Sequence, residues 1–244
     1  MAVARVRFKS EAFGRWMTYN ILLPDNGEGP FPVVMQLHGL GDDHRSWIDR
    51  TNIVRYAGEY PLVIVFPDGG TSGYLNWNES GRLHRQAYED LIVKDIPDHL
   101  RRHFNVTHGP WAIGGLSMGG YGAMRIGLKY PERFSSIWAH SAAFHIDQYL
   151  DPDLIAPEAI EDAGVEVHAR RLVESGAPRP VISCDCGVDD ELLQFNRELD
   201  SLMNQIDLTH HYAEHPGAHT WDYWDEHVQT ALAQHHRVLN GNGL

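Results

Sequence analysis

Cysteine, long apolar runs and basic side chains are all scarce in this chain of 244 residues. The two cysteines, Cys184 and Cys186, stand two positions apart. On a strand such residues point to the same face, where they are not placed for an ordinary disulfide, and this fits a reducing cytoplasm. No apolar run approaches the ~20 residues that cross a membrane, and the first residues contain no apolar export signal. The sequence therefore predicts a cytoplasmic protein outside the membrane.

The charge balance argues against two classes of partner. With 20 basic and 33 acidic side chains, the formal net charge is −13, whereas binding to nucleic acid or anionic lipid relies on clustered Lys and Arg. We expect neither partner. The 16 histidines invite a metal site, but no Cys-x-x-Cys pair or His-Glu-x-x-His helix accompanies them. The sequence therefore predicts no metal and no cofactor.

Apolar runs alternate with helical patterns along the chain. Such alternation indicates crossover connections and a largely parallel sheet with helices on both faces, to which the two leading strands add antiparallel. Pro97 is expected to kink or split its helix. The fold class is α/β, and the length suits a single domain over residues 1–244. The predicted strands are 5–9, 15–24, 31–39, 61–70, 111–117, 134–143, 180–187 and 207–215, and the predicted helices are 88–104, 118–130, 191–205 and about 221–238.

One segment interrupts this alternation. Residues 145–179 contain Pro152, Pro157 and Pro178, many charged side chains and no strand pattern. Long segments of this kind within a compact domain are often functional. The sequence therefore predicts a small cap-like insertion over a site, with a plain surface excursion as the alternative.

Glycines crowd around a single serine in the stretch GGLSMGGYG, residues 114–122. It contains G-x-S-x-G, with Gly115, Ser117 and Gly119 at the fixed positions, between an apolar strand and a helical pattern. This is the context of a nucleophile elbow, a sharp turn that exposes the serine hydroxyl at the carboxyl edge of a sheet. We therefore interpret Ser117 as a nucleophile. The alternative is a glycine-rich turn that only packs a helix against a strand.

A serine nucleophile needs a histidine base and an acid that orients the base. After an elbow of this kind the acid comes before the histidine in the chain. His215 and His219 are the candidate bases, and His219 is favoured because it lies in a glycine-containing loop, whereas His215 ends a strand. The candidate acids are Asp185, Asp189 and Asp190. Asp185 lies inside the strand pattern, and spacing alone does not separate the other two.

The negative charge that develops on a substrate oxygen needs preorganised N–H donors, which form an oxyanion hole. One donor is expected from the residue after the nucleophile, Met118. The other is expected from the loop after the third predicted strand, where LHGLGDD places Leu40 between Gly39 and Gly41. We therefore assign the amides of Leu40 and Met118 to the hole, with His38 and the two glycines as the supporting turn.

Several segments together resemble one family: LHGLGDDHRSW, FPDGGTSGYLN, GGLSMGGYGAMRIGLKYPERFSS, CGVDDELL and HPGAHTWDYW. They are similar to the esterase D-like branch of the α/β-hydrolases, which includes S-formylglutathione hydrolases, tributyrin esterase-like carboxylesterases, feruloyl and acetyl xylan esterases, and mycolyltransferases. The resemblance spans about residues 15–235 and implies the α/β-hydrolase fold. The family pattern C-G-x-x-D, then an apolar or aromatic residue and Leu, implies Asp190 as the acid beside Ser117 and His219. Glu191 departs from that pattern.

The resemblance implies a serine carboxylesterase that hydrolyses short-chain or aryl esters, acetyl and feruloyl esters included. The HGLG loop is closer to the carboxylesterase members than to the S-formylglutathione hydrolases, which typically carry a serine in place of the histidine. An acyltransferase or an S-formylglutathione hydrolase-type thioesterase would use the same triad. A noncatalytic binding protein, the alternative from another class, would be expected to lack a triad member. The oligomeric state is left open, association into a homo-oligomer included.

Overall fold

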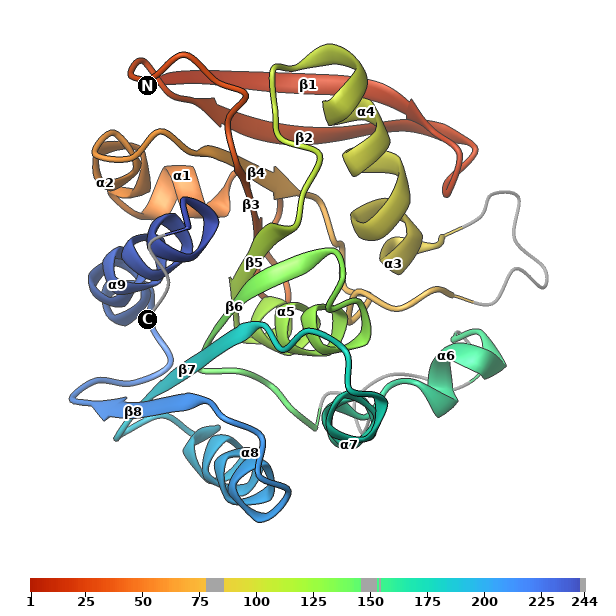
Figure 1. The fold of residues 1–244 in the computed structure, drawn as a ribbon, viewed down its shortest axis with the longest axis vertical. Coiled ribbons are helices and arrows are strands. Elements are labelled where there is room, and N and C mark those ends of the chain that lie inside the picture. Colours follow the sequence, from red (N-terminus) through yellow and green to blue (C-terminus); the bar gives the residue numbers. More distant parts are fainter. Residues whose placement is uncertain (78–85, 146–152, 154, 242–244) are drawn as a thin grey trace.

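The computed structural model describes residues 1–77, 86–145, 153 and 155–241 (Figure 1). Within these residues eight strands form one sheet in the order β1-β2-β4-β3-β5-β6-β7-β8. The pairs β1 with β2 and β2 with β4 are antiparallel, and the pairs from β4 through β3 to β8 are parallel. The strands are β1 Ala2–Ser10, β2 Arg15–Leu23, β3 Val33–Leu37, β4 Val63–Pro67, β5 Trp111–Leu116, β6 Phe134–His140, β7 Val181–Gly187 and β8 His211–His215.

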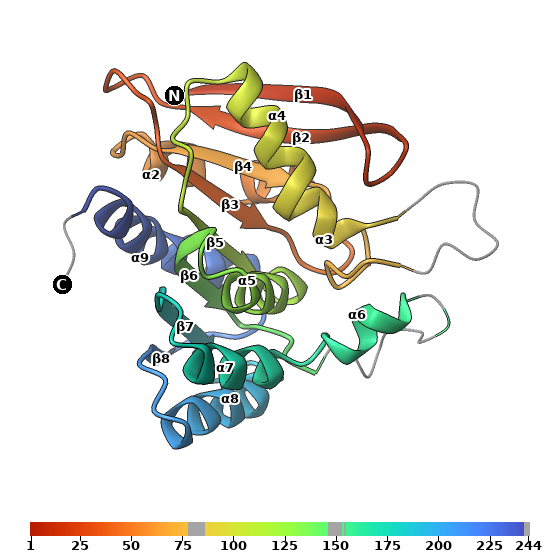
Figure 2. The ribbon, with the colours of Figure 1, turned by 45° about the vertical axis from the view of Figure 1, so that its right-hand side comes forward.

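Helices cover both faces of this sheet, as Figures 1 and 2 show. α1, α2 and α9 lie on one face, and α3, α4, α5, α7 and α8 lie on the other. The helices are α1 Ser46–Arg50, α2 Ile53–Ala57, α3 Tyr88–Asp90, η1 Leu91–Asp95, α4 Ile96–His103, α5 Met118–Lys129, α6 Pro157–Glu161, α7 Val165–Ser175, α8 Leu193–Gln205 and α9 Trp221–Leu239. This arrangement confirms the predicted α/β fold with antiparallel N-terminal strands.

The central strands are apolar throughout because both of their faces are covered. In β3 every residue is buried, and successive side chains enter different cores: Val33 and Met35 pack toward α4 and α5, whereas Val34 packs toward α1, α2 and α9. Side chains alternate between faces along a strand, so a strand with two covered faces needs an unbroken apolar run. The central strands are therefore packed on both faces, and the loops at their carboxyl ends lie along one edge of the sheet.

The helix predicted over 88–104 is divided into α3, η1 and α4, with the division just before Pro97. Pro97 has no N–H, so the carbonyl of Val93 has no helical donor four residues later. The Arg133 guanidinium donates to that carbonyl instead, at 2.5 Å. The chain accommodates the proline with a π-helical turn over Leu91–Asp95. Pro97 thus splits the helix, as predicted from the sequence.

Several strands are shorter than predicted, and in two cases a residue with positive φ lies where the predicted strand does not form. Ser141 has φ 45° and directly follows β6, so the strand predicted over 134–143 ends at His140. Asp207 has φ 55°, and the N–H of Leu208 donates to the Met203 carbonyl at 2.9 Å, which closes the end of α8. The strand predicted over 207–215 therefore begins only at His211.

The structure corrects part of the insertion predicted over 145–179. Helix α7 is the crossover connection between β6 and β7, and it packs against α5 and α8. It therefore belongs to the layer that covers the sheet and is not part of a cap. Residues 146–152 and 154 lie outside the described residues, so a cap formed by the first part of the segment stays a prediction.

Candidate active site

Ser117 lies at the turn where β5 ends and α5 begins, and its backbone is held in a strained conformation with φ 51° and ψ −119°. Small neighbours make this turn feasible. A Cβ atom on Gly115 would lie 2.5 Å from the Gly119 carbonyl oxygen, and one on Gly119 would lie 2.5 Å from the Leu37 oxygen. Only glycine fits at such close backbone approaches. The G-x-S-x-G pattern therefore has its physical cause in the packing of α5 against β3 and β5.

Backbone hydrogen bonds connect the ends of neighbouring strands around this serine. The Ser117 N–H donates to the His140 carbonyl at 2.9 Å, and the Ala143 N–H donates to the Ser117 carbonyl at 3.1 Å. The Ser141 N–H donates in turn to the Asp185 carbonyl at 2.7 Å. Parallel strands end at the same edge of the sheet. The turns after β5 and β6 are thereby connected to each other and to β7 at this carboxyl edge.

Ser117, His219 and Asp190 form one chain of hydrogen bonds. His219 Nε2 lies 3.0 Å from Ser117 Oγ, and His219 Nδ1 lies 2.9 Å from Asp190 Oδ2 and 3.1 Å from Asp190 Oδ1. His219 is in the loop between β8 and α9, and its ring packs edge-on against Trp224 with centroids 4.9 Å apart. The imidazole can therefore accept the serine proton through Nε2 while Nδ1–H points at the carboxylate.

The Asp190 carboxylate is kept ionised in spite of its burial. Its side chain is inaccessible to solvent, whereas the His219 side chain is 24% exposed. Burial alone would raise the pKa of Asp190, but hydrogen bonds from His219 and from the Leu192 N–H, the latter at 2.8 Å, bring the pKa below its ordinary value. An ionised acid next to Nδ1 stabilises the imidazolium that would form when His219 takes a proton.

The other candidates from the sequence have different surroundings. His215 stacks on His227 with centroids 4.3 Å apart, away from the serine. Asp185 is buried in β7 and accepts hydrogen bonds from Trp138 Nε1 at 2.5 Å and from the Tyr223 hydroxyl at 2.8 Å. Asp189 is exposed and has no side-chain bond to the imidazole among the described residues. Of the three acids, Asp190 is the one in contact with His219.

The loop after β3 brings Leu40 beside the serine. Gly39, Leu40 and Ser117 line the same cavity. Met118 is the first residue of α5, so its N–H is one of the helix's orphaned donors. Gly41 has φ 83°, a conformation that favours glycine, and lets the loop turn away behind Leu40.

The His38 side chain holds the loop after β3 in place through hydrogen bonds. It is buried, its Nδ1 lies 2.8 Å from the Gly39 carbonyl oxygen, and its Nε2 accepts the Gly69 N–H at 2.8 Å. This pattern of partners fits a neutral imidazole with its proton on Nδ1. His38 therefore connects the turn after β3 to the loop after β4.

Tyr74 is a residue of this region that sequence reasoning missed. Its buried hydroxyl accepts the His38 N–H and donates to the His38 carbonyl, both at 3.0 Å. Its ring leaves no room for a side chain at Gly69, where a Cβ atom would lie 2.3 Å from Tyr74 Cε1. The segment FPDGGTSGYLN contains the tyrosine and the glycine, but nothing in its pattern indicates contact with a residue 36 positions earlier.

The cavity beside Ser117 has a volume of about 250 Å³. Leu116, Trp221 and Trp224 provide apolar walls, and Asp42 and Arg50 lie at its polar side. The Arg50 guanidinium stands 5.7 Å from the Trp221 ring centroid. The cavity thus offers a small space of mixed polar and apolar lining next to the hydroxyl and the Leu40 loop.

The described part of the chain contains no cluster of three or more His, Cys, Asp or Glu side chains that could hold a metal ion. In the same residues, no helix combines the length and apolar character that a membrane crossing requires. Both cysteines are free and buried in β7.

A mostly parallel sheet with helices on both faces, and a serine at a strained strand-to-helix turn, define an α/β-hydrolase. Residues 10–235 match the family described as "Putative esterase", and the chain belongs to this esterase family. Among curated proteins, it is 27% identical to an acetyl esterase of Caldicellulosiruptor saccharolyticus, over 95% of this chain and 97% of the relative. It is 26% identical to the S-formylglutathione hydrolase of Paracoccus denitrificans, over 95% and 90% of the two chains.

A solved structure of high similarity is a fluorophosphonate-binding serine hydrolase of Staphylococcus aureus, with a TM-score of 0.84, 25% identity and coverage of 96% of this chain and 97% of that one. These relatives confirm the resemblance predicted from the sequence and its α/β-hydrolase fold.

Proposed function

We propose that this protein is a serine carboxylesterase that hydrolyses short-chain and aryl esters, with Ser117 as nucleophile, His219 as base and Asp190 as the acid that orients it. The observation that carries this proposal is the continuous hydrogen-bond chain from Ser117 Oγ through His219 to Asp190, with bonds of 3.0 and 2.9 Å. Geometry of this kind is the test for an activated nucleophile.

The reaction proceeds by two acyl transfers. Ser117 Oγ attacks the ester carbonyl while His219 Nε2 takes its proton, and the N–H groups of Leu40 and Met118 bind the resulting oxyanion. The C–O bond to the alcohol breaks, and the alcohol leaves with the proton held by His219. Water then attacks the acyl-enzyme as His219 takes one of its protons. The acid is released when that proton returns to Ser117, which regenerates the enzyme.

The size of the cavity supports a small acyl group. Its volume of about 250 Å³ is below the ~300 to 1,000 Å³ of typical small-molecule sites, and its apolar walls include Trp221 and Trp224. Acetyl and other short acyl groups suit this space best. The acetyl esterase relative, at 27% identity, supports the same substrate class.

Hydrolysis of a p-nitrophenyl ester series, from acetate to long acyl chains, tests this function. We expect the highest kcat/KM with short chains, and a loss of at least about 10⁴-fold in Ser117→Ala, because the nucleophile is gone. Ser201→Ala, on an exposed position of α8, is the matched control and should retain full activity and fluorophosphonate labelling. Activity of Ser117→Ala close to that of the unmodified protein would rule out the assigned nucleophile.

Two additions to that assay distinguish ester hydrolysis from related activities. Addition of a competing alcohol would divert the acyl group to a new ester if the protein is an acyltransferase, whereas a hydrolase continues to release acid. S-formylglutathione cleavage faster than any oxygen ester would assign a thioesterase instead.

We also infer a cytoplasmic location, because Cys184 and Cys186 are unpaired thiols in one strand and reducing compartments keep thiols in that state.

A further inference from the structure

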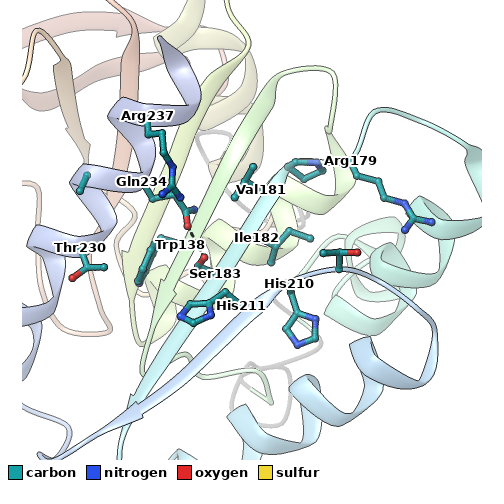
Figure 3. A pocket seen from close by; sticks show the side chains of 13 residues that line it. Trp138, Arg179, Val181, Ile182, Ser183, His210, His211, Thr230, Gln234 and Arg237 are labelled. Carbon is teal, nitrogen blue, oxygen red and sulfur yellow. Dashed lines mark hydrogen bonds between the residues drawn. The ribbon is translucent and has the colours of Figure 1, made fainter. Parts of the chain in front are cut away.

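A second cavity lies at the opposite edge of the sheet from Ser117. Its volume is about 700 Å³, and it is lined by residues at the amino ends of β7 and β8, including Val181 and His211. Ser117 follows the carboxyl end of β5, and β5 through β8 are parallel. The two cavities therefore open at opposite edges. Figure 3 shows this second cavity between α9 and the first residues of β7 and β8.

The floor of this cavity is apolar, and its polar atoms already have partners. Trp138 and Ile182 contribute apolar surface, and Trp138 Nε1 donates to the buried Asp185 carboxylate. The Ser183 hydroxyl donates to the Gln234 side-chain oxygen at 2.5 Å, and the Gln234 amide nitrogen donates to β6. A floor whose donors and acceptors are all satisfied favours an apolar group over water or a polar ligand.

One wall is a stripe of α9. Thr230, Ala233, Gln234 and Arg237 all line the cavity, and their spacing of three and four residues places them on one face of the helix. Ala233 is exposed, so the stripe is open to a ligand. The small side chain at that position leaves the cavity open to solvent on this side, while the floor residues Trp138 and Ile182 are themselves only 5% and 2% exposed.

Positively charged side chains lie at the opening of this second cavity. Arg237 and Arg179 stand on opposite sides of the cavity (Figure 3), and Arg237 has no ion pair among the described residues. Arg179 donates to the neutral Asp207 carbonyl at 3.1 Å, so its charge is not compensated there. His210, a third lining residue, lies 2.8 Å from the Asp200 carboxylate through its Nε2. The 13 lining residues include no Asp or Glu, although the chain's formal net charge is −13.

We propose that this cavity binds an amphipathic monoanion, an aliphatic carboxylate whose chain lies on the Trp138 and Ile182 floor and whose carboxylate is held by Arg237. The volume of about 700 Å³ lies within the range of small-molecule sites. A guanidinium matches a carboxylate bidentately, and one carboxylate is sufficient for Arg237, while Arg179 on the other side of the cavity already donates to the Asp207 carbonyl. This inference is independent of the proposed function, since it uses none of the residues around Ser117.

Calorimetric titration of decanoate into Ser117→Ala protein tests the proposal without turnover. In this background we expect Arg237→Gln to raise the Kd about tenfold or more, the size of one charge-assisted hydrogen bond. Ala233→Trp fills the groove and should remove binding while circular dichroism shows an intact fold. Decanol, with the same chain and no charge, should bind at least about tenfold more weakly than decanoate.

Two matched variants locate the ligand. Arg170→Gln removes the same charge from an exposed position of α7 and should leave the Kd unchanged, as should Arg50→Gln in the cavity beside Ser117. Loss of binding in Arg50→Gln but not in Arg237→Gln would place decanoate at Ser117 and overturn the proposal. No binding, equal effects of Arg170→Gln and Arg237→Gln, or equal affinity for decanol would also overturn it.

Discussion

Asp189 and Asp190 are adjacent and carry the same side chain, yet their surroundings differ completely. Asp190 Oδ2 lies 2.9 Å from His219 Nδ1 and its side chain is buried, whereas Asp189 is exposed. An amide in place of the Asp190 carboxylate no longer selects the Nδ1–H tautomer or stabilises the imidazolium. From this structural difference we expect the two residues to differ in their effect on catalysis.

We expect Asp190→Asn to lower kcat for p-nitrophenyl acetate about 10⁴-fold, as loss of a triad acid does elsewhere. Asp189→Asn is the matched control, and its kcat should be unchanged. Steady-state kinetics with both variants, together with their Tm values, measures this. Similar losses in the two variants, or a larger loss in Asp189→Asn, would mean that the acid is assigned to the wrong residue.

At the scale of single residues, the sequence predicts those functional residues that stand in a short local motif. Ser117 stands in a pattern of five positions, and the structure brings it into contact with His219, 102 residues later. The spacing alone left Asp189 and Asp190 open, because both follow the same strand, and the family pattern favoured Asp190. Tyr74 could not be predicted, since its hydroxyl acts on the His38 backbone through loop packing that no local pattern records.

At the scale of elements, helix α5 approaches β3 so closely that there is no space for a side chain at Gly119 in its first turn. A Cβ atom on Gly119 would lie 2.5 Å from the Leu37 oxygen and 2.6 Å from the His38 oxygen, and both contacts are to backbone. On Gly127, in the same helix, a Cβ atom would meet the end of the Ile137 side chain at 2.5 Å. The end of the Ile137 side chain can move aside, whereas the backbone oxygens of Leu37 and His38 cannot.

We expect Gly119→Ala to lower the free energy of unfolding by about 2 kcal/mol, the order of an overpacked core, and to lower kcat because α5 carries Ser117 away from His219. Gly127→Ala is the control within the same helix. It should lower both the free energy of unfolding and kcat by less than Gly119→Ala does. Urea unfolding at constant m-value and p-nitrophenyl acetate hydrolysis measure the two effects. Equal effects of the two substitutions would contradict the close approach at the elbow.

Elements with long apolar or helical patterns were predictable, and their ends were not. The largely parallel sheet with its antiparallel leading strands follows from the alternation of apolar runs and helical patterns, and the helices α5, α8 and α9 follow from patterns of several turns. The ends depend on single residues: Ser141 and Asp207 adopt positive φ, and Pro97 imposes a π-helical turn. The sequence does not predict the short helices α1 and α2, because five residues are too few to show a helical period of apolar side chains.

At the scale of the whole molecule, a buried cluster of charged side chains connects helices α3 and α5. Arg125 on α5 is fully buried and lies 2.6 Å from Glu89 on α3, and Lys129 approaches the same carboxylate at 2.8 Å. Burial alone would raise the pKa of Glu89, but the Arg125 charge and the hydrogen bonds from Lys129 and Tyr130 lower it to about 2. The ionised carboxylate is therefore favoured in the folded protein.

A pKa lowered by folding gives stability that is present above the ordinary pKa of 4.5 and lost as the pH falls toward 2. We expect this cluster to contribute on the order of 3 kcal/mol to the pH dependence of unfolding across that window. Glu89→Gln should be less stable at pH 7, because Arg125 loses its partner, and its stability should vary less with pH.

Denaturant unfolding at several pH values measures this effect. Glu132→Gln, whose carboxylate is 62% exposed beside Arg133, is the control and should follow the unmodified protein. Parallel curves for Glu89→Gln and the unmodified protein would contradict the assigned role of the cluster.

The backbone connections at the carboxyl edge also bear on the order in which the chain folds. The N–H of Val188 donates to the His215 carbonyl at 2.8 Å, and that of Asp189 donates to the Gly217 carbonyl at 2.9 Å, so the loop carrying His219 is fixed only once β8 has docked on β7. β8 is one of the two edge strands of the sheet, and it pairs with β7 alone. During refolding, compactness and helix content can recover before this edge is in place. Ester hydrolysis by the chain would thus be among the last native properties to return.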